Sequence, residues 1–240
     1  MTVPDLTIIV PTRSRPESVG RVIRAWEATD AFEIADLLFV VDADDPGISD
    51  YVNAITGRAR FLVAPTWRPL VPKLNAAARD IAFPRHGEQA PFALGFAGDD
   101  HLPRTAGWAQ AYVSRLRELG TGIVYCDDGY QGRKLATQWA MTSDIVRALG
   151  RMVPAPVEHL FCDNSVSDLG RAAGCLDYLD QCLIEHMNPY AARKAEMDEQ
   201  YARVNSPEQY RRDRPTYKRW LRTAAAHDAR IVRDLKTREG

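Results

Sequence analysis

Two adjacent carboxylates and a histidine, Asp99, Asp100 and His101, follow a short run of apolar and small residues at positions 92–97. Such a run is typical of a strand buried on both faces, as in a parallel sheet covered by helices. Open α/β sheets bind ligands at the carboxyl ends of their strands, and carboxylate oxygens with imidazole nitrogens suit a divalent cation such as Mg²⁺ or Mn²⁺. The alternative is a turn in which an aspartate caps the helix that follows Pro103.

Two earlier predicted strands also end in polar loops. Residues 6–10 are mostly β-branched, and residues 35–41 form a second, largely apolar run. Because strands that alternate with helices form a largely parallel sheet with right-handed crossovers, their loops gather at one edge. We therefore expect that edge to bring the following side chains together: Thr12, Arg13, Arg15, Asp42, Asp44, Asp99 and Asp100.

The remaining pattern completes an α/β chain. Apolar periodicity predicts helices at 72–83, 108–119 and 143–149, and a further helix beginning near Asp163 and Asn164, which are good capping types. Shorter apolar runs predict strands at 60–63 and 122–126 and an edge strand at 135–141. We expect one compact domain over residues 1–188 and a helical C-terminal extension over residues 189–240, with Pro207 and Pro215 as helix breaks.

Composition places few limits on function. The 240 residues are 45% hydrophobic and 26% charged with a net charge of −1, which gives no whole-surface attraction to nucleic acid. The four cysteines form no CxxC pair, so neither a zinc knuckle nor a disulfide framework is indicated. The first residues lack the basic and long apolar regions of a signal peptide, and no apolar run is long enough for a membrane span. We therefore expect a cytoplasmic protein.

The extension differs in charge from the rest of the chain. It contains thirteen Lys and Arg against eight Asp and Glu, a net charge of +5, whereas residues 1–188 carry −6. A basic helical segment is commonly a solvated face. It could instead grip an acidic partner or a diphosphate, close over a ligand as a lid with Lys194 near the phosphates, or pair two subunits as a homodimer.

Five segments, taken in order, resemble the GT-A glycosyltransferases, and most closely the large inverting family that contains many bacterial and phage sugar transferases (family 2-like). They are LTIIVPTRSRP, VVDADDP, the helix around Asn75, FAGDDHLP and CDNSVSDLGRAAG. The resemblance covers residues 6–188 and implies a GT-A (Rossmann-like), mostly parallel sheet flanked by helices. It also implies a metal-dependent, inverting transfer of a sugar from a nucleotide-diphosphate sugar to an acceptor hydroxyl.

By this resemblance, the loops after the first two strands hold the nucleotide. A UDP-sugar is the preferred donor, and a GDP-sugar is the alternative. No motif identifies the acceptor. The residues that would bind the nucleotide are Pro11, Thr12, Arg13, Arg15, Asp42 or Asp44, Asn75 and Asp99. Lys73 and Arg68 could contact the phosphates, although basic residues in loops are commonly just solvated.

A divalent cation on a carboxylate would neutralise the diphosphate that leaves as the glycosidic bond breaks. The family's DxD motif is incomplete here, because Ala97 stands where its first acid is often found. Asp99 and Asp100 are predicted at the metal and the ribose, without a division of roles, and a DxH motif would add His101 as a ligand. His186 matches a late histidine with which relatives complete the metal shell, although a lone histidine is commonly structural.

An inverting transfer also requires a base that takes the proton of the attacking hydroxyl. Asp163 fits this role by resemblance to the family's late acidic motif, where a Glu-Asp pair is commoner, and its rival role is a helix cap. Asp127 and Asp128, at another strand end, are alternative bases or acceptor ligands. The aromatic side chains that could stack on sugar rings or pack in the core are Trp67, Trp139 and Tyr130.

Two other functions stay open. A sugar nucleotidyltransferase has a similar sheet but a glycine-rich loop after the first strand, and the corresponding segment here, PTRSRP, contains no glycine. A non-catalytic GT-A-like module that binds a saccharide or a partner would keep the fold without the chemistry. Ala97 in place of an acid is consistent with that module.

Overall fold

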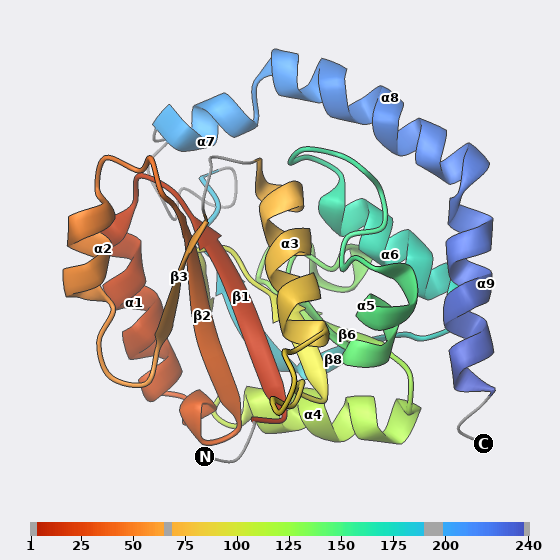
Figure 1. Ribbon diagram of the computed structural model, residues 1–240, viewed down its shortest axis with the longest axis horizontal. Coiled ribbons are helices and arrows are strands. Elements are labelled where there is room, and N and C mark those ends of the chain that lie inside the picture. The colour runs from red at the N-terminus through yellow and green to blue at the C-terminus, as the bar shows by residue number, and fades with distance from the viewer. Residues whose placement is uncertain (1–3, 65–68, 190–198, 238–240) are drawn as a thin grey trace.

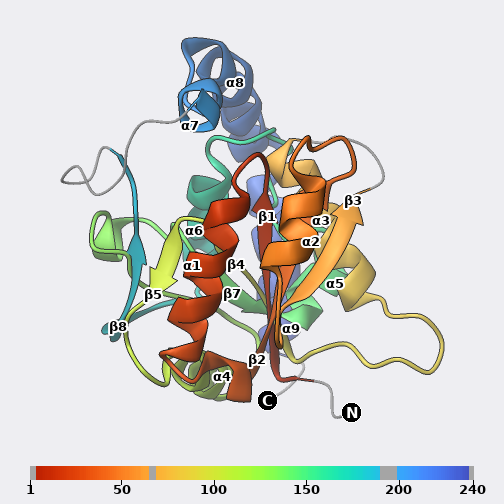
Figure 2. The same ribbon diagram turned by 90° about the vertical axis from the view of Figure 1, so that its left-hand side faces the viewer.

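A mixed sheet with helices on both faces forms the body of the molecule (Figures 1 and 2). The computed structural model describes residues 4–64, 69–189 and 199–237. Within these residues the sheet has eight strands in the order β3-β2-β1-β4-β7-β6-β8-β5. The predicted α/β class and the Rossmann-like sheet flanked by helices are therefore confirmed.

Most of the observed elements match predicted ones, whereas the segments at 48–54, 101–103 and 176–186 were not predicted to be regular elements. The strands are β1 (Leu6–Thr12), β2 (Ala35–Asp42), β3 (Arg60–Ala64), β4 (Ala93–Phe96), β5 (His101–Pro103), β6 (Ile123–Asp127), β7 (Trp139–Thr142) and β8 (Leu176–His186). The helices are α1 (Pro16–Glu27), α2 (Ile48–Ala54), α3 (Leu70–Ala82), α4 (Trp108–Leu119), α5 (Ser143–Leu149), α6 (Cys162–Ala173), α7 (Glu199–Val204), α8 (Pro207–Thr223) and α9 (Ala225–Lys236), with 3₁₀ turns η1 (Ala31–Glu33) and η2 (Gly132–Lys134).

The first half of the sheet is parallel, as expected. β1 pairs in parallel with both β2 and β4, and β2 pairs in parallel with β3. Gly95 allows β4 to pass close to its neighbours, because a Cβ at this position would approach Ile8 Cδ1 to 2.2 Å and the Trp139 carbonyl oxygen to 2.7 Å. The loops after β1, β2 and β4 consequently emerge at the same edge of the sheet.

The second half departs from the prediction in two places. β7 is antiparallel to both β4 and β6, so it is a short, fully buried inner strand rather than the predicted edge strand at 135–141. Its apolar residues are buried because a helix layer covers each side of it. The weakly alternating residues 176–186 form β8, which pairs in parallel with β6 and antiparallel with β5. These contacts extend the sheet beyond its parallel half.

Two hydrophobic clusters fill the spaces on either side of the sheet. One includes buried residues of α1, α2 and α4, among them Trp26, Tyr51 and Trp108. The other includes buried residues of α3, α5, α6 and α9, among them Leu74 and Val232. None of the helices within the described residues combines the length and apolar character needed to cross a bilayer.

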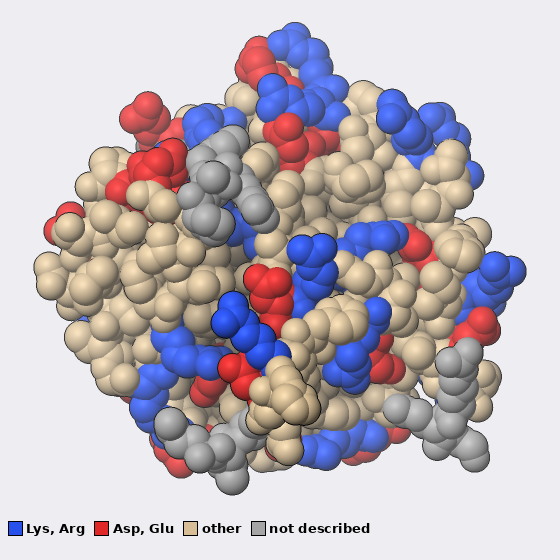
Figure 3. Space-filling model, in the orientation of Figure 1, with Lys and Arg blue, Asp and Glu red and all other residues tan. Residues whose placement is uncertain are grey.

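The C-terminal helices wrap around the rim of the molecule, where Lys and Arg side chains recur over α8 and α9 (Figures 1 and 3). Trp220 and Val232 are buried in the same cluster as α5 and α6. This part of the extension therefore packs on the domain, and the division at residue 188 stays a prediction. Pro207 begins α8 as predicted, but Pro215 lies inside that helix and does not break it, which corrects the prediction.

Candidate functional site

A cavity of about 350 Å³ lies where the loops after β1, β2 and β4 meet. Most of the residues singled out in the sequence contribute to its walls. They are Pro11, Thr12, Arg13, Arg15, Asp42, Lys73, Asp99, Asp100, His101, Asp163 and His186. Hydrogen bonds across the three loops, described below, confirm the expected gathering of polar side chains at this edge.

Asp42, the last residue of β2, is a fully buried carboxylate between two cations. Its Oδ2 accepts from Lys73 Nζ at 2.7 Å and from Arg13 Nη1 at 3.0 Å. Burial lowers the pKa of Lys73, and the hydrogen bond and charge of Asp42 oppose that shift. Asp42 Oδ1 is buried without a hydrogen-bond partner among the described residues, so this oxygen can accept a hydrogen bond from a ligand.

Asp99 ties the first loop to the central strand. Its Oδ2 accepts from Thr12 Oγ1 at 2.6 Å, and its Oδ1 accepts from Arg15 Nη1 at 3.2 Å. Burial and the neighbouring charge of Asp100 raise the pKa of Asp99 to about 6, while Arg15 and Thr12 oppose the shift. Both oxygens are thus engaged by the β1 loop.

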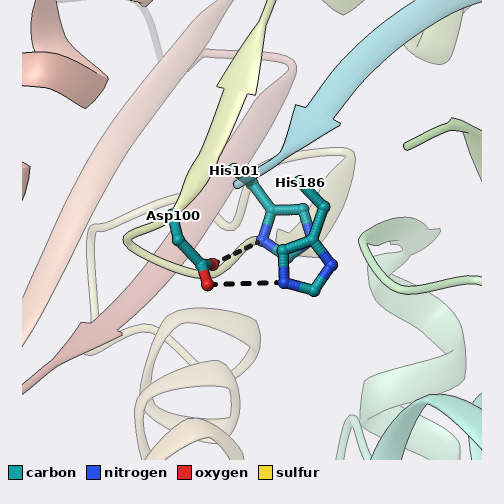
Figure 4. A group of neighbouring side chains, drawn as sticks. All are labelled: Asp100, His101 and His186. Carbon is teal, nitrogen blue, oxygen red and sulfur yellow. Dashed lines mark ion pairs between the residues drawn. The ribbon is translucent and has the colours of Figure 1, made fainter. Parts of the chain in front are cut away.

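The next three side chains have a geometry that could hold a cation. One ligand atom from each of Asp100, His101 and His186 lies within 4.8 Å of the other two (Figure 4). Asp100 Oδ1 is 3.2 Å from His101 Nδ1, and Asp100 Oδ2 is 3.3 Å from His186 Nε2. The two imidazole rings stack with their centroids 4.2 Å apart. One carboxylate and two imidazoles form a donor set that suits a divalent metal.

Backbone pairing brings these side chains together from distant parts of the chain. His101 and His186 are opposite residues of the antiparallel strands β5 and β8. The amide of His186 donates to the Asp128 carbonyl, and the amide of Met187 donates to the Asp100 carbonyl, each at 2.9 Å. The position of His186 is therefore set by the sheet rather than by a flexible loop.

The electrostatics of the three groups differ. Burial alone would raise the pKa of Asp100, but hydrogen bonds and charge from His101 and His186 hold it well below its usual range. Burial lowers the pKa of His101, whereas Asp100 and Asp128 raise the pKa of His186 against the effect of burial. His101 Nε2 and His186 Nδ1 are buried without a hydrogen-bond partner within the described ranges. A bound ion or ligand is one way to satisfy such atoms.

Asp163 is the second residue of α6 and lines the same cavity. The N-cap of that helix is Phe161, so Asp163 does not occupy the cap position that was its rival role. Its Oδ1 accepts from the Asn164 amide at 2.8 Å. Burial raises the pKa of Asp163, which makes its carboxylate a stronger base than an exposed aspartate.

Another wall of the cavity comes from the loop before α6 and from the extension. Residues 158–161 of that loop and Cys162, the first residue of α6, line the cavity. The lining residues of the extension are Tyr201, Arg203, Val204, Asn205, Gln209 and Arg212. The extension therefore contributes to the site, and closure driven by a ligand stays a prediction.

Two predicted nucleotide ligands lie outside this cavity. Asp44 has a side chain that is 56% exposed and pairs with Arg13 at 2.8 Å. Asn75 supports a loop instead: its Oδ1 accepts from the amides of Met152 and Val153 at 3.0 and 2.8 Å, and its Nδ2 donates to the Val153 carbonyl. Neither side chain therefore lines this cavity, and their roles as nucleotide ligands stay predictions.

Four further candidates also lie outside the cavity lining. Asp127 and Asp128 stabilise the turn after β6, and Asp128 Oδ1 accepts from three successive amides at residues 130–132. Trp139 is fully buried and packs against Phe96, so it takes the core position that was the alternative to sugar stacking. Tyr130 is 47% exposed on the surface. Three predicted residues, Trp67, Arg68 and Lys194, fall outside the described ranges.

Sequence reasoning missed residues that shape the site. Tyr51 is fully buried, and its hydroxyl lies 3.1 Å from Thr12 Oγ1 and accepts from the Arg15 amide at 2.8 Å. A Cβ at Gly98 would approach Asp100 Oδ1 to 2.4 Å and His101 Nδ1 to 2.7 Å. A glycine immediately before the two aspartates was a usable signal, whereas nothing in the sequence connected Tyr51 to the first loop.

Comparison with known proteins gives matches by structure. No protein-family model matches the chain, and no curated protein matches it by sequence. S. aureus TarS 1–349 in complex with UDP-GlcNAc is 10% identical with a TM-score of 0.59, over 96% of this chain and 71% of that one. The mannosyltransferase PcManGT from Pyrobaculum calidifontis, in complex with GDP-Man and Mn²⁺, is 15% identical with a TM-score of 0.56, over 100% and 77%.

A third similar structure is a putative nucleotide-diphospho-sugar transferase from Desulfovibrio desulfuricans G20. It is 11% identical with a TM-score of 0.51, and the match covers 98% of both chains. At such identities the likeness concerns the fold. The chain therefore has the GT-A-like fold that its motifs predicted.

Proposed function

We propose that this chain is a metal-dependent, inverting glycosyltransferase that moves a sugar from a nucleotide-diphosphate sugar to an acceptor hydroxyl. The observation that carries the proposal is that Asp42, Asp100 and Asp163 line one cavity in three different electrostatic environments. Asp42 pairs with two cations, Asp100 faces two stacked imidazoles, and Asp163 has a raised pKa. The first environment suits binding of a nucleotide, the second suits binding of a divalent cation, and the third suits removal of a proton from a hydroxyl.

Asp42 is the better candidate for recognition of the nucleoside. Its unpartnered Oδ1 can accept from a base N–H or a ribose hydroxyl, whereas the exposed Asp44 holds Arg13 in place. Lys73 and Arg13 supply positive charge beside it. The similar structures contain UDP-GlcNAc and GDP-Man, and we expect a UDP-sugar first and a GDP-sugar as the alternative.

Asp100, His101 and His186 are the residues that would hold the cation. Their separations support this assignment. Two imidazole donors favour Mn²⁺ over Mg²⁺, which prefers oxygen ligands. When bound, the ion would supply positive charge to the diphosphate leaving group. Asp99 then acts by holding Thr12 and Arg15, because both its oxygens are engaged there.

Asp163 is the proposed general base. A partly buried carboxylate with a raised pKa takes a proton from an attacking hydroxyl more readily than an ordinary aspartate does. Attack by that hydroxyl on the face opposite the leaving diphosphate would invert the configuration at the anomeric carbon. Asp128 is a weaker candidate, because its carboxylate already accepts hydrogen bonds from the turn after β6.

A non-catalytic saccharide-binding module is the second candidate. Ala97, in the position of the first acid of the DxD motif, favours it. Such a module would bind a nucleotide sugar or a saccharide without breaking the glycosidic bond. The two candidates therefore differ in one observable, the release of nucleoside diphosphate.

A donor-cleavage assay tests the proposal. The full chain is incubated with a panel of UDP- and GDP-sugars and Mn²⁺, and released nucleoside diphosphate is measured with water as the acceptor. We expect cleavage of at least one donor. Binding of a donor without cleavage would support the binding module, and a chain that neither binds nor cleaves any donor would contradict both functions.

A further inference from the structure

Asp213, on α8 of the extension, is a carboxylate buried to 1% exposure against the loop before α6. Its Oδ1 accepts from the Glu158 amide at 2.8 Å, and its Oδ2 accepts from the amides of His159 and Leu160 at 3.0 and 2.8 Å. Gln209 Nε2 donates to the same Oδ2 at 2.8 Å. A single side chain of the extension thus holds three successive backbone amides of a loop that lines the cavity.

The same helix also holds the end of that loop. Phe161 has a left-handed backbone with a φ of 67°, which is uncommon for a residue with a side chain. Its ring stacks on Tyr217 at 5.1 Å and lies 5.4 Å from the ring of Tyr210, and both tyrosines belong to α8. Contacts from α8 therefore support an unfavourable backbone conformation directly before α6.

The loop connects two parts of the proposed active site. Phe161 is the N-cap of α6, and Asp163 is the second residue of that helix. At the other end of the loop, the Glu158 carbonyl accepts from the Val71 amide at 2.9 Å, in the first turn of α3, which also carries Lys73. A shift of this loop would consequently move the proposed base relative to the donor.

We propose that α8 is a clamp on this loop and that Asp213 is a positioning residue for the transfer reaction. Asp213 acts through residues 158–161 on the carboxylate of Asp163, without touching the donor or the acceptor. The inference rests on the proposed function and adds to it that the extension is required for catalysis. A purely structural Asp213 would stabilise the fold but leave the chemistry of the folded protein unchanged.

Asp228 provides a matched control. It is also a buried carboxylate of the extension, at 3% exposure, and accepts from Trp220 Nε1 and Arg151 Nη2, each at 2.8 Å. It lies on α9 and does not line the cavity. Asp213→Asn and Asp228→Asn each remove one buried charge that accepts hydrogen bonds, so both should lower the melting temperature.

The test compares the two variants with wild type in the full chain. It uses the donor that wild type cleaves fastest, and it measures kcat for donor cleavage, donor affinity by calorimetry, and hydrogen exchange of the amides at 158–162. For Asp213→Asn we expect kcat to fall by about 10–100-fold, as for a small misplacement of a catalytic group. Donor affinity should change less than about twofold. The amides of Glu158, His159 and Leu160, which Asp213 accepts from, should exchange faster. Asp228→Asn should keep wild-type kcat and wild-type exchange at these amides.

Tyr210→Ala keeps the proposal testable if Asp213→Asn does not fold. Tyr210 is 45% exposed, so the variant should fold. Because it loses one of the two rings beside Phe161, its kcat should fall by about 2–10-fold. If wild type is active, either of two results would overturn the clamp alone. In the first, Asp213→Asn and Tyr210→Ala both keep the wild-type kcat. In the second, Asp213→Asn loses no more kcat than Asp228→Asn does. A wild type that cleaves no donor would overturn the proposed function together with the clamp.

Discussion

The two sides of the cavity treat their carboxylates differently. On the side formed by β1, β2 and β4, Asp42 pairs with Lys73 and Arg13, and Asp99 pairs with Arg15. On the side formed by α6, Asp163 has no ion pair among the described residues and accepts from an amide of its own helix. On the first side Arg15 opposes the effect of burial, which together with the charge of Asp100 still raises the pKa of Asp99 to about 6. On the second side burial raises the pKa of Asp163.

This difference separates binding from proton transfer. The cations that pair with these carboxylates are held in place before a diphosphate arrives, so they can donate hydrogen bonds to it without reorganisation. A base gains from the opposite environment, because its pKa must approach the working pH. The comparison therefore predicts that substitutions on the two sides change different measurable quantities.

The largest effect is expected on the α6 side. Asp163→Asn removes the proposed base without changing the size of the side chain, so transfer should fall by about 10²–10⁴-fold while donor affinity stays nearly unchanged. Donor cleavage and calorimetry measure the two quantities. Transfer at the wild-type rate would show that Asp163 is not the base. The proposed division into a binding side and a proton-transfer side would then fail.

A smaller effect is expected on the β2 side. Asp42→Asn should weaken UDP binding by about 10-fold, because a hydrogen bond to a charged group is stronger than one to an amide. Asp44→Asn, at an exposed position, should change affinity by less than about twofold. Titration of both variants with UDP measures the difference. Equal affinities for wild type and both variants would exclude either acid from nucleoside recognition.

The smallest effect concerns pH. A base is active when ionised, and burial raises the pKa of Asp163, so activity should rise with pH through a value above the ordinary pKa of an aspartate. Profiles of kcat/KM from about pH 4 to about pH 8 for wild type and Asp163→Asn isolate this titration from those of Asp99 and His186. An acid limb that persists in the variant would belong to another group.

Much of the donor side was predictable from the sequence. Short apolar runs that end at Thr12, Asp42 and Asp99 indicated strand ends, and parallel pairing brings strand ends to one edge. His186 was predicted only by resemblance, because its approach to Asp100 depends on β8 pairing with β5 across the chain. Local sequence patterns carry no information about such pairing.

The side formed by the loop before α6 was predicted less well. The contacts of Asp213 with the amides of residues 158–160 join segments more than fifty residues apart, and an aspartate inside a charged helix gives no sign of burial. Asn75 was assigned to the nucleotide, but its amide meets a loop that the sequence did not show to be near. In both cases tertiary packing decides which backbone groups a polar side chain meets.

Calorimetric titration of the full chain with the preferred UDP- or GDP-sugar tests the proposed metal-dependent mechanism most directly. It is performed once with Mn²⁺ and once with excess chelator. Asp100 faces two stacked imidazoles in a geometry that suits a cation, so we expect tight binding with Mn²⁺ and severely weakened binding either in chelator or in the Asp100→Ala variant. Donor affinity that is the same with Mn²⁺, with chelator and in Asp100→Ala would contradict the proposed metal-dependent mechanism.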